Sequence, residues 1–333
     1  MTLAQRTRIS ADELARARSV LAIVTDAYDE KVVGQKGLRR SLLVALMTGG
    51  HILLESVPGL AKTTAAEALA DAVHATFKRI QCTPDLLPSD IIGTQIFDYA
   101  NSTFATQLGP VHANFVLLDE INRSSAKTQS AMLEAMQERQ TTIGGVVHAL
   151  PDLFLVLATQ NPIEQEGTYH LPEAQLDRFL LKEVLDYPDF AEEVEILDRI
   201  SDGVFDRPSS GESVHIDDVL FLQDVARRVY LDPAITNYIV SAVYVTRHAG
   251  TYIAADLAGC IDYGASPRAS IAFSRAARAL ALINGRDHVI PDDVKELRHV
   301  VLRHRLILNF EAIADDVRPE TIIDAVFAAV QAP

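Results

Sequence analysis

From about residue 20 to residue 190, short apolar runs alternate with longer segments of helical periodicity, and this alternation constrains the fold most. The runs at 51–54, 79–83, 115–118, 154–158 and 180–184 are typical of buried strands. The segments between them, such as 65–73 and 130–136, carry apolar side chains at i, i+3 and i+4. Strands that alternate with helices form parallel sheets, so we expect an α/β fold with a parallel sheet flanked by helices.

A polar segment rich in Gly, Pro and Ser ends this half of the chain. Residues 201–214 read SDGVFDRPSSGESV, which indicates a linker between domains. Beyond the linker the pattern is helical throughout, with one helix start at Ser266-Pro267 and another at Pro291. We therefore divide the chain into an N-terminal helical extension (1–19), an α/β core (20–200), the linker and a helical domain (215–333).

Composition excludes several functional classes. Of the 333 residues 48% are hydrophobic, and no run approaches the roughly 18 apolar residues of a membrane span. No secretory signal is recognised, and the two distant cysteines, Cys82 and Cys260, suit a reducing cytoplasm rather than a disulfide framework. The cysteine usage therefore predicts a cytoplasmic protein. The formal net charge of −15 repels phosphate backbones, so we expect no nucleic-acid partner.

The segment 55–64, ESVPGLAKTT, nearly matches the phosphate-binding pattern G-x-x-x-x-G-K-[ST]. Lys62 and Thr63 stand at the lysine and hydroxyl positions, whereas Ser56 and Ala61 replace the two glycines. An apolar strand precedes the segment, Gly59 remains within it, and an Ala-rich helix follows. This order suits a loop whose N–H groups bind phosphate at a helix N-terminus. A lysine-bearing helix after a strand is nevertheless common in α/β proteins.

Polar side chains follow two later strands. Asp119 and Glu120 end the apolar run at 115–118, where the first could hold Mg²⁺ and the second could orient a water molecule. A solvated strand end is the alternative. Their separation from Lys62 favours an arrangement in which the two strands are neighbours. Asn161 follows the next strand, in reach of a γ-phosphate, although Asn-Pro is also ordinary turn chemistry.

Two arginines occupy positions where a cation needs an explanation. Arg178 lies beside a short helical segment in LPEAQLDRF, where an ion pair with Asp177 or Glu173 is the alternative to a functional role. Arg268 lies in the first turn of the helix that starts at Ser266-Pro267. A cation is unfavourable at that end of a helix unless it answers an anion such as a phosphate, and an ordinary exposed arginine is the alternative.

Two segments interrupt the α/β pattern as hairpins. Residues 141–148 place β-forming residues on both sides of Gly144-Gly145, a strong signal for a two-residue hairpin turn. Residues 99–112 fit a second, looser hairpin or loop.

Taken in order, these motifs resemble the MoxR family of AAA+ ATPases. The resemblance rests on VVGQ (32–35), VPGLAKT (57–63), LLDEINR (117–123), ATQNP (158–162), LPEAQLDRF (171–179) and SPR (266–268), and it runs from about residue 20 to the C-terminus. It implies an AAA+ P-loop core followed by an all-α lid domain. Alanine is usual in this family at position 61, whereas Ser56 departs from the usual glycine and costs about 1 kcal/mol if its φ is positive.

The resemblance also implies roles for individual residues. Lys62 and Thr63 would bind the phosphates and Mg²⁺, Asp119 would support Mg²⁺, and Glu120 would polarise the attacking water. Asn161 would be the first sensor, Arg178 the arginine finger for a neighbouring subunit and Arg268 the second sensor. The remaining nucleotide-binding positions are Val33, Gly34 and Gln35 near the adenine, together with Pro58, Gly59, Leu60, Ala61 and Thr64 around the phosphates.

For the whole protein, the resemblance implies an ATP-hydrolysing, chaperone-like remodeller that matures client complexes or inserts cofactors or metals into them. It implies a homo-oligomeric ring, typically a hexamer, and a partner with a von Willebrand factor A domain. The same core motifs also occur in magnesium-chelatase-like and MCM-helicase-like motor subunits. The hairpins carry hardly any basic residues, which disfavours the helicase. A nucleotide-gated scaffold that does not hydrolyse ATP is a further alternative because of Ser56.

Overall fold

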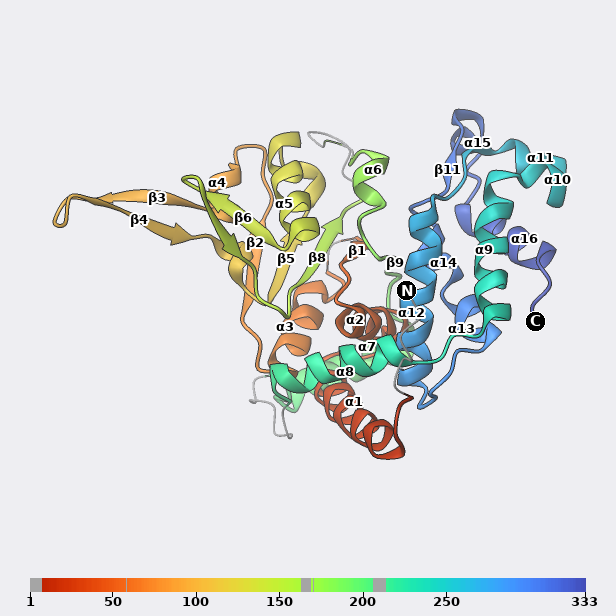
Figure 1. Ribbon diagram of the computed structural model, residues 1–333, viewed down its shortest axis with the longest axis horizontal. Coiled ribbons are helices and arrows are strands. Elements are labelled where there is room, and N and C mark those ends of the chain that lie inside the picture. The colour runs from red at the N-terminus through yellow and green to blue at the C-terminus, as the bar shows by residue number, and fades with distance from the viewer. Residues whose placement is uncertain (1–7, 58, 163–168, 170, 206–213) are drawn as a thin grey trace, which may run out of the picture.

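The computed structural model describes residues 8–57, 59–162, 169, 171–205 and 214–333. Within these residues a five-stranded parallel sheet has the order β2-β5-β8-β1-β9 (Figure 1). Its strands are β1 (Ile52–Glu55), β2 (Phe77–Gln81), β5 (Phe115–Asp119), β8 (Leu155–Gln160) and β9 (Leu181–Val184). The parallel α/β core predicted from the alternating pattern is confirmed, with strand ends shifted by up to two residues.

The two faces of the sheet have separate cores because alternate strand residues point to opposite sides. Ile52, Leu117 and Leu157 pack into one apolar cluster, whereas Leu53 and Val116 pack into the other. The first cluster includes α1 (Ala11–Lys31), α2 (Lys36–Thr48) and α3 (Lys62–Ala72); the second includes α4 (Pro88–Ile92) and α5 (Ala126–Glu138). Both faces of the sheet are therefore buried.

Helix α1 begins at a capping box in which Ser10 accepts a hydrogen bond from the Glu13 amide and Glu13 accepts one from the Ser10 amide. It then continues without interruption to Lys31. The predicted boundary between residues 19 and 20 falls inside this helix. Buried residues such as Val24 and Tyr28 join α1 to the core.

Two hairpins leave the sheet, and one begins earlier than predicted. Strands β6 (Gln140–Ile143) and β7 (Val146–Ala149) meet at Gly144-Gly145, where both glycines have positive φ. The other hairpin, β3 (Gly93–Asp98) with β4 (Thr103–Leu108), projects far from the body (Figure 1). Residues 99–112 supply only its turn, its second strand and η1 (Pro110–His112). The first strand was missed because its apolar residues face solvent rather than a core.

The helical lid follows α7 (Phe190–Ser201); its part from α9 onward lies on the right of Figure 1, whereas its first helix, α8, lies beside α1 and α2. Its elements are α8 (Ile216–Arg228), α9 (Pro233–Arg247), α10 (Ala249–Tyr252), α11 (Ala255–Gly259), α12 (Pro267–Ile283), α13 (Pro291–Glu296), α14 (Arg298–Leu302), α15 (Phe310–Ala314) and α16 (Pro319–Ala329). The region is not helical throughout, because β10 (Ile261–Tyr263) pairs with β11 (Ile307–Leu308). Lid residues such as Leu222 and Phe273 share the first apolar cluster with α1 and α2. Among the helices of the described residues, none is long and apolar enough to cross a membrane.

Candidate active site

The loop after β1 ends in a left-handed residue that turns the chain into α3. Gly59 has a φ of 87° and Ala61 a φ of 51°, and Lys62 is the first residue of the helix. A Cβ on Gly59 would meet no atom within 4 Å, so the space beside the loop is open. The left-handed conformation of Ala61 costs about 1–2 kcal/mol, a cost that glycine at this position would avoid. Pro58, expected in the same cradle, lies outside the described residues.

Ser56 fits the loop without backbone strain. It is not among the described residues with positive φ. Its side chain is buried and its hydroxyl donates to the Val57 carbonyl at 3.1 Å, while its amide donates to the Gln160 carbonyl at the end of β8. The serine therefore continues the strand rather than occupying a glycine-specific turn.

Lys62 shares an electrostatic environment with two carboxylates. Partial burial lowers the pKa of Lys62, whereas the negative charges of Asp119 and Glu120 raise it. The three side chains thus interact across the carboxyl edge of the sheet, as expected for a lysine and an acid pair that serve the same phosphates.

Thr159 of β8 fixes both acidic residues and was missed from the sequence. Its hydroxyl donates to Asp119 Oδ1 at 2.8 Å and accepts from the Glu120 amide at 2.8 Å. Thr159 is fully buried and Asp119 is 8% exposed. Glu120 itself adopts a left-handed conformation, with φ 56° and ψ 53°, which an L-residue keeps only when its surroundings hold it there.

Three further polar side chains surround the carboxylates. Arg79 of β2 forms an ion pair with Asp119 Oδ2 at 2.5 Å. Gln81 Nε2 donates to Glu120 Oε2 at 3.0 Å, and Arg123 Nη1 reaches the same oxygen at 3.2 Å. The only sequence feature that could have indicated a role for Arg79 and Gln81 is that polar residues alternate with apolar ones at these positions of β2.

The prediction that the strand before the lysine loop, β1, and the acidic strand, β5, are adjacent in the sheet is wrong. β1 pairs with β8 and β9, and β5 pairs with β2 and β8, so β8 lies between the loop strand and the acidic strand. This arrangement places Asn161, which is 6% exposed, directly beyond the central strand of the three. The loop, the acids and Asn161 consequently meet at one edge.

The residues present fit a nucleotide and a divalent cation. Asp119 presents a fixed carboxylate to the site, Thr63 lies in the first turn of α3, and open space adjoins Gly59. Carboxylate and hydroxyl oxygens are ligands that Mg²⁺ accepts, and a helix N-terminus attracts phosphate. Leu60 is buried beneath the loop and Thr64 is exposed beside it.

The segment 33–35 reaches the same edge of the sheet. Gln35 Nε2 donates to the Asp186 carbonyl at 3.0 Å, and the neighbouring Leu185 amide donates to the Glu55 carbonyl at the end of β1. Val33 is buried, and Gly34 and Gln35 both have positive φ. The segment thus lies near the ends of β1 and β9, at the edge of the sheet where the loop lies.

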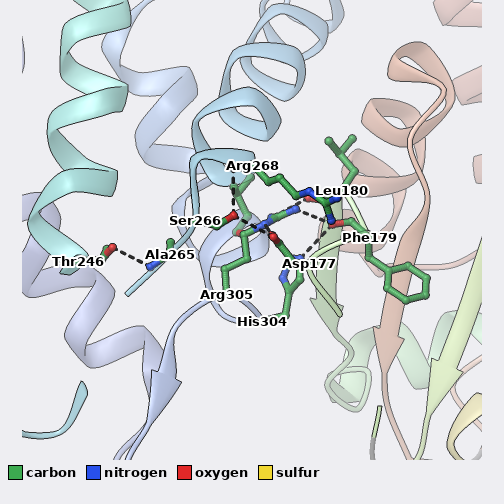
Figure 2. A network of polar contacts seen from close by, with 10 residues as sticks. Asp177, Phe179, Leu180, Thr246, Ala265, Ser266, Arg268, His304 and Arg305 are labelled. Carbon is green, nitrogen blue, oxygen red and sulfur yellow. Dashed lines mark hydrogen bonds and ion pairs between the residues drawn. The ribbon is translucent and has the colours of Figure 1, made fainter. Parts of the chain in front are cut away.

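Arg178 and Arg268 meet elsewhere, in a cavity of about 380 Å³ whose lining includes Arg139, Arg275 and Arg305. Arg305 is 6% exposed and bonds Asp177 Oδ1 at 2.8 Å, so the predicted alternative of an Asp177–Arg178 pair is wrong. Ser266 Oγ donates to Asp177 Oδ2 and accepts from the Arg268 amide, which ties the start of α12 to this cluster (Figure 2). The guanidinium of Arg178 makes no hydrogen bond or ion pair with any residue that the structure describes.

This arginine cavity lies at the amino edge of the sheet, whereas the lysine loop lies at the carboxyl edge. Gly49, Gly50 and His51 line the cavity and precede β1, and Phe179 and Leu180 precede β9. The four residues of β1 alone span about 10 Å. Arg178 and Arg268 are therefore brought together with each other, but not with Lys62.

The sheet order, the lysine loop and the acid pair define a P-loop nucleotide-binding protein, and comparison with known proteins places it more narrowly. The family model described as "ATPase family associated with various cellular activities (AAA)" matches residues 51–181, and that of the "AAA lid domain" matches residues 253–326. A crystal structure from Cytophaga hutchinsonii is 45% identical, with a TM-score of 0.90 over 97% of each chain.

Named relatives identify the family. Chaperone MoxR1 of Mycobacterium tuberculosis is 50% identical over 91% of this chain and 79% of its own length. Protein MoxR of Paracoccus denitrificans is 31% identical over 92% and 94%, and the uncharacterized protein YeaC of Bacillus subtilis 44% over 94% and 95%. The chain belongs to the MoxR family of AAA+ ATPases.

Proposed function

We propose that the protein hydrolyses ATP at the carboxyl edge of its sheet. The observation that carries this proposal is the convergence of Lys62, Asp119 and Glu120, with Thr159 fixing both acids. Lys62 and Thr63 bind the β- and γ-phosphates, with the loop amides beneath them. Glu120 orients the attacking water, and Asn161 senses the γ-phosphate. Asp119 and Thr63 would hold Mg²⁺, which would supply positive charge to offset the charge on the phosphates.

The arginine cavity supports a ring in which one subunit completes the site of the next. Arg178 and Arg268 lie at the amino edge, away from the Lys62 loop of their own chain. Arginines supplied by another subunit stabilise transition-state charge in related reactions. We therefore assign both the finger and the second sensor to the nucleotide of a neighbouring copy, and we propose a homo-oligomeric ring, a hexamer by the resemblance.

The biological role we propose is that of a cytoplasmic, chaperone-like remodeller that matures client complexes or inserts cofactors or metals into them. Relatives carry the names chaperone MoxR1 and MoxR. The projecting β3–β4 hairpin supports a client-binding role, because Phe97, Tyr99 and Phe104 form an exposed cluster with ring centroids 5.1 and 5.2 Å apart. A partner with a von Willebrand factor A domain belongs to the same proposal.

The experiment that tests the catalytic assignment compares Lys62→Ala with Glu120→Gln. Lys62→Ala removes the phosphate ligand, so nucleotide binding and hydrolysis should both be lost. Glu120→Gln keeps the loop and should bind ATP without turning it over. Calorimetry with a non-hydrolysable ATP analogue measures binding, and phosphate release measures turnover. Undiminished hydrolysis in both variants contradicts the assignment of these residues to the site. A wild-type protein that binds ATP without hydrolysing it supports the alternative function, a nucleotide-gated scaffold.

A further inference from the structure

Helix α7 exposes an apolar stripe. Four of its five large apolar side chains are exposed, 85% at Phe190, 43% at Val194, 64% at Leu197 and 57% at Ile200, whereas Ile196 is half-buried. At 100° per residue, the first three lie within about 60° of one another on the helix surface. None of the 12 residues of this helix, all of which the structure describes, is buried.

The helix is attached to the protein through the opposite side, which carries Glu192, Ile196 and Arg199. The carboxylate of Glu192 lies against Gly34, where an added Cβ would approach it to 2.4 Å. Arg199 Nη1 donates to the Asp29 carbonyl at 2.7 Å and the Glu30 carbonyl at 3.2 Å. Glu192 and Arg199 lie about 180° from the apolar stripe. A surface helix normally turns its apolar stripe inward, so this orientation indicates that another protein surface covers α7.

Charge identifies the surface that fits. Carboxylates adjoin the stripe at Glu193 and Asp198, about 60° and 80° from Phe190 on opposite sides. Helix α12 offers the complement, because Arg268, Ile271 and Arg275 share one exposed face at i, i+3 and i+7, with Ile271 59% exposed. An apolar stripe between acids thus matches an apolar side chain between arginines.

We propose that the α7 stripe docks on the Arg268–Ile271–Arg275 face of a second copy of this chain, the next subunit of the ring. The inference rests on the proposed function, in which Arg178 and Arg268 reach a neighbour's nucleotide. Because Glu192 packs on Gly34 beside the expected base position, the copy that brings these arginines also meets α7. Packing α7 against α7 would instead bring like charges together, which disfavours that pairing.

Assembly of the Glu120→Gln protein with ATP and Mg²⁺, measured by sedimentation velocity, tests the surface. Leu197→Glu places a charge in the stripe and should raise the protein concentration needed for assembly at least about tenfold, as should Ile271→Glu on the opposing face. Ala191→Glu is the matched control, since it adds the same charge to the exposed side of α7, about 100° from Phe190. It should assemble normally. Thermal melts and analogue binding should remain as in the parent for all three.

Disulfide trapping identifies the occupant. In a Cys260→Ser background, Leu197→Cys combined with Ile271→Cys should give a ladder of covalent oligomers on oxidation, whereas either cysteine alone should give none. A covalent dimer from Leu197→Cys alone shows α7 against α7 and contradicts the proposal. Normal assembly of both glutamate variants also contradicts the proposed docking surface, but it does not contradict the proposal that the wild-type protein hydrolyses ATP. If the wild-type protein neither hydrolyses ATP nor assembles, the proposed function itself is contradicted.

Discussion

Replacing Thr159 with valine should uncouple the two acids of the site while leaving the volume of β8 unchanged. The hydroxyl makes one bond to the Asp119 carboxylate and accepts one from the Glu120 amide, each at 2.8 Å. Bonds to charged groups contribute about 1.5–3 kcal/mol and neutral ones about 0.5–1.5 kcal/mol. The loss also leaves the left-handed Glu120, with a φ of 56°, without its amide partner.

We expect the turnover number for ATP to fall about 100-fold in Thr159→Val, because a displacement of about 1 Å in a reacting group has that effect. Stability should fall by about 2–4.5 kcal/mol, the sum of the two bonds. Thr159→Ser keeps the hydroxyl and is the matched control, with turnover within a few-fold of wild type. Steady-state phosphate release, urea unfolding and analogue binding separate these effects. Turnover in Thr159→Val within threefold of wild type refutes the reasoning.

Three further outcomes are expected. Ser56→Gly should change the affinity for an ATP analogue by less than about tenfold in calorimetry, because Ser56 carries no positive-φ strain; a gain of several orders of magnitude contradicts this. Burial lowers the pKa of His51 from 6.5 to about 3, so the unfolded chain binds the proton first and stability falls as pH drops from 6.5 toward 3. At pH 5 this effect should remove about 2 kcal/mol in urea unfolding, and His51→Gln should flatten the slope. DNA and RNA should show no sub-micromolar binding by anisotropy at about 0.15 M salt, given the −15 charge and hairpins without Lys or Arg.

Much of the fold followed from local patterns. Apolar runs bounded by helical periodicity gave the parallel sheet, since buried parallel strands carry few polar residues. The Gly144-Gly145 pair predicted the β6–β7 turn because both positions need positive φ. Lys62 was identified from the phosphate-loop pattern, and Asp119, Glu120 and Asn161 were identified because they end or follow apolar runs.

Features that depend on tertiary neighbours did not follow. No local pattern states that β8 lies between β1 and β5, and hence that Thr159 bridges the acids. The arginine cavity draws on separate segments of α5, α12 and the turn before β9, so its convergence was invisible in the sequence. The strand Gly93–Asp98 was missed because a projecting hairpin needs no buried face.

Mixing two inactive variants tests most directly the claim that each subunit completes its neighbour's site. Arg178→Ala keeps the phosphate site but offers its neighbour no finger, and Glu120→Gln lacks the water-orienting acid but offers an intact Arg178. Alone, Arg178→Ala should turn ATP over about 10³–10⁵-fold more slowly than wild type, and Glu120→Gln should not turn it over at all. Once a labelled subunit shows exchange, the mixture should regain ATPase activity at interfaces that pair an intact site with an intact finger. A mixture that exchanges subunits and stays inactive contradicts the claim.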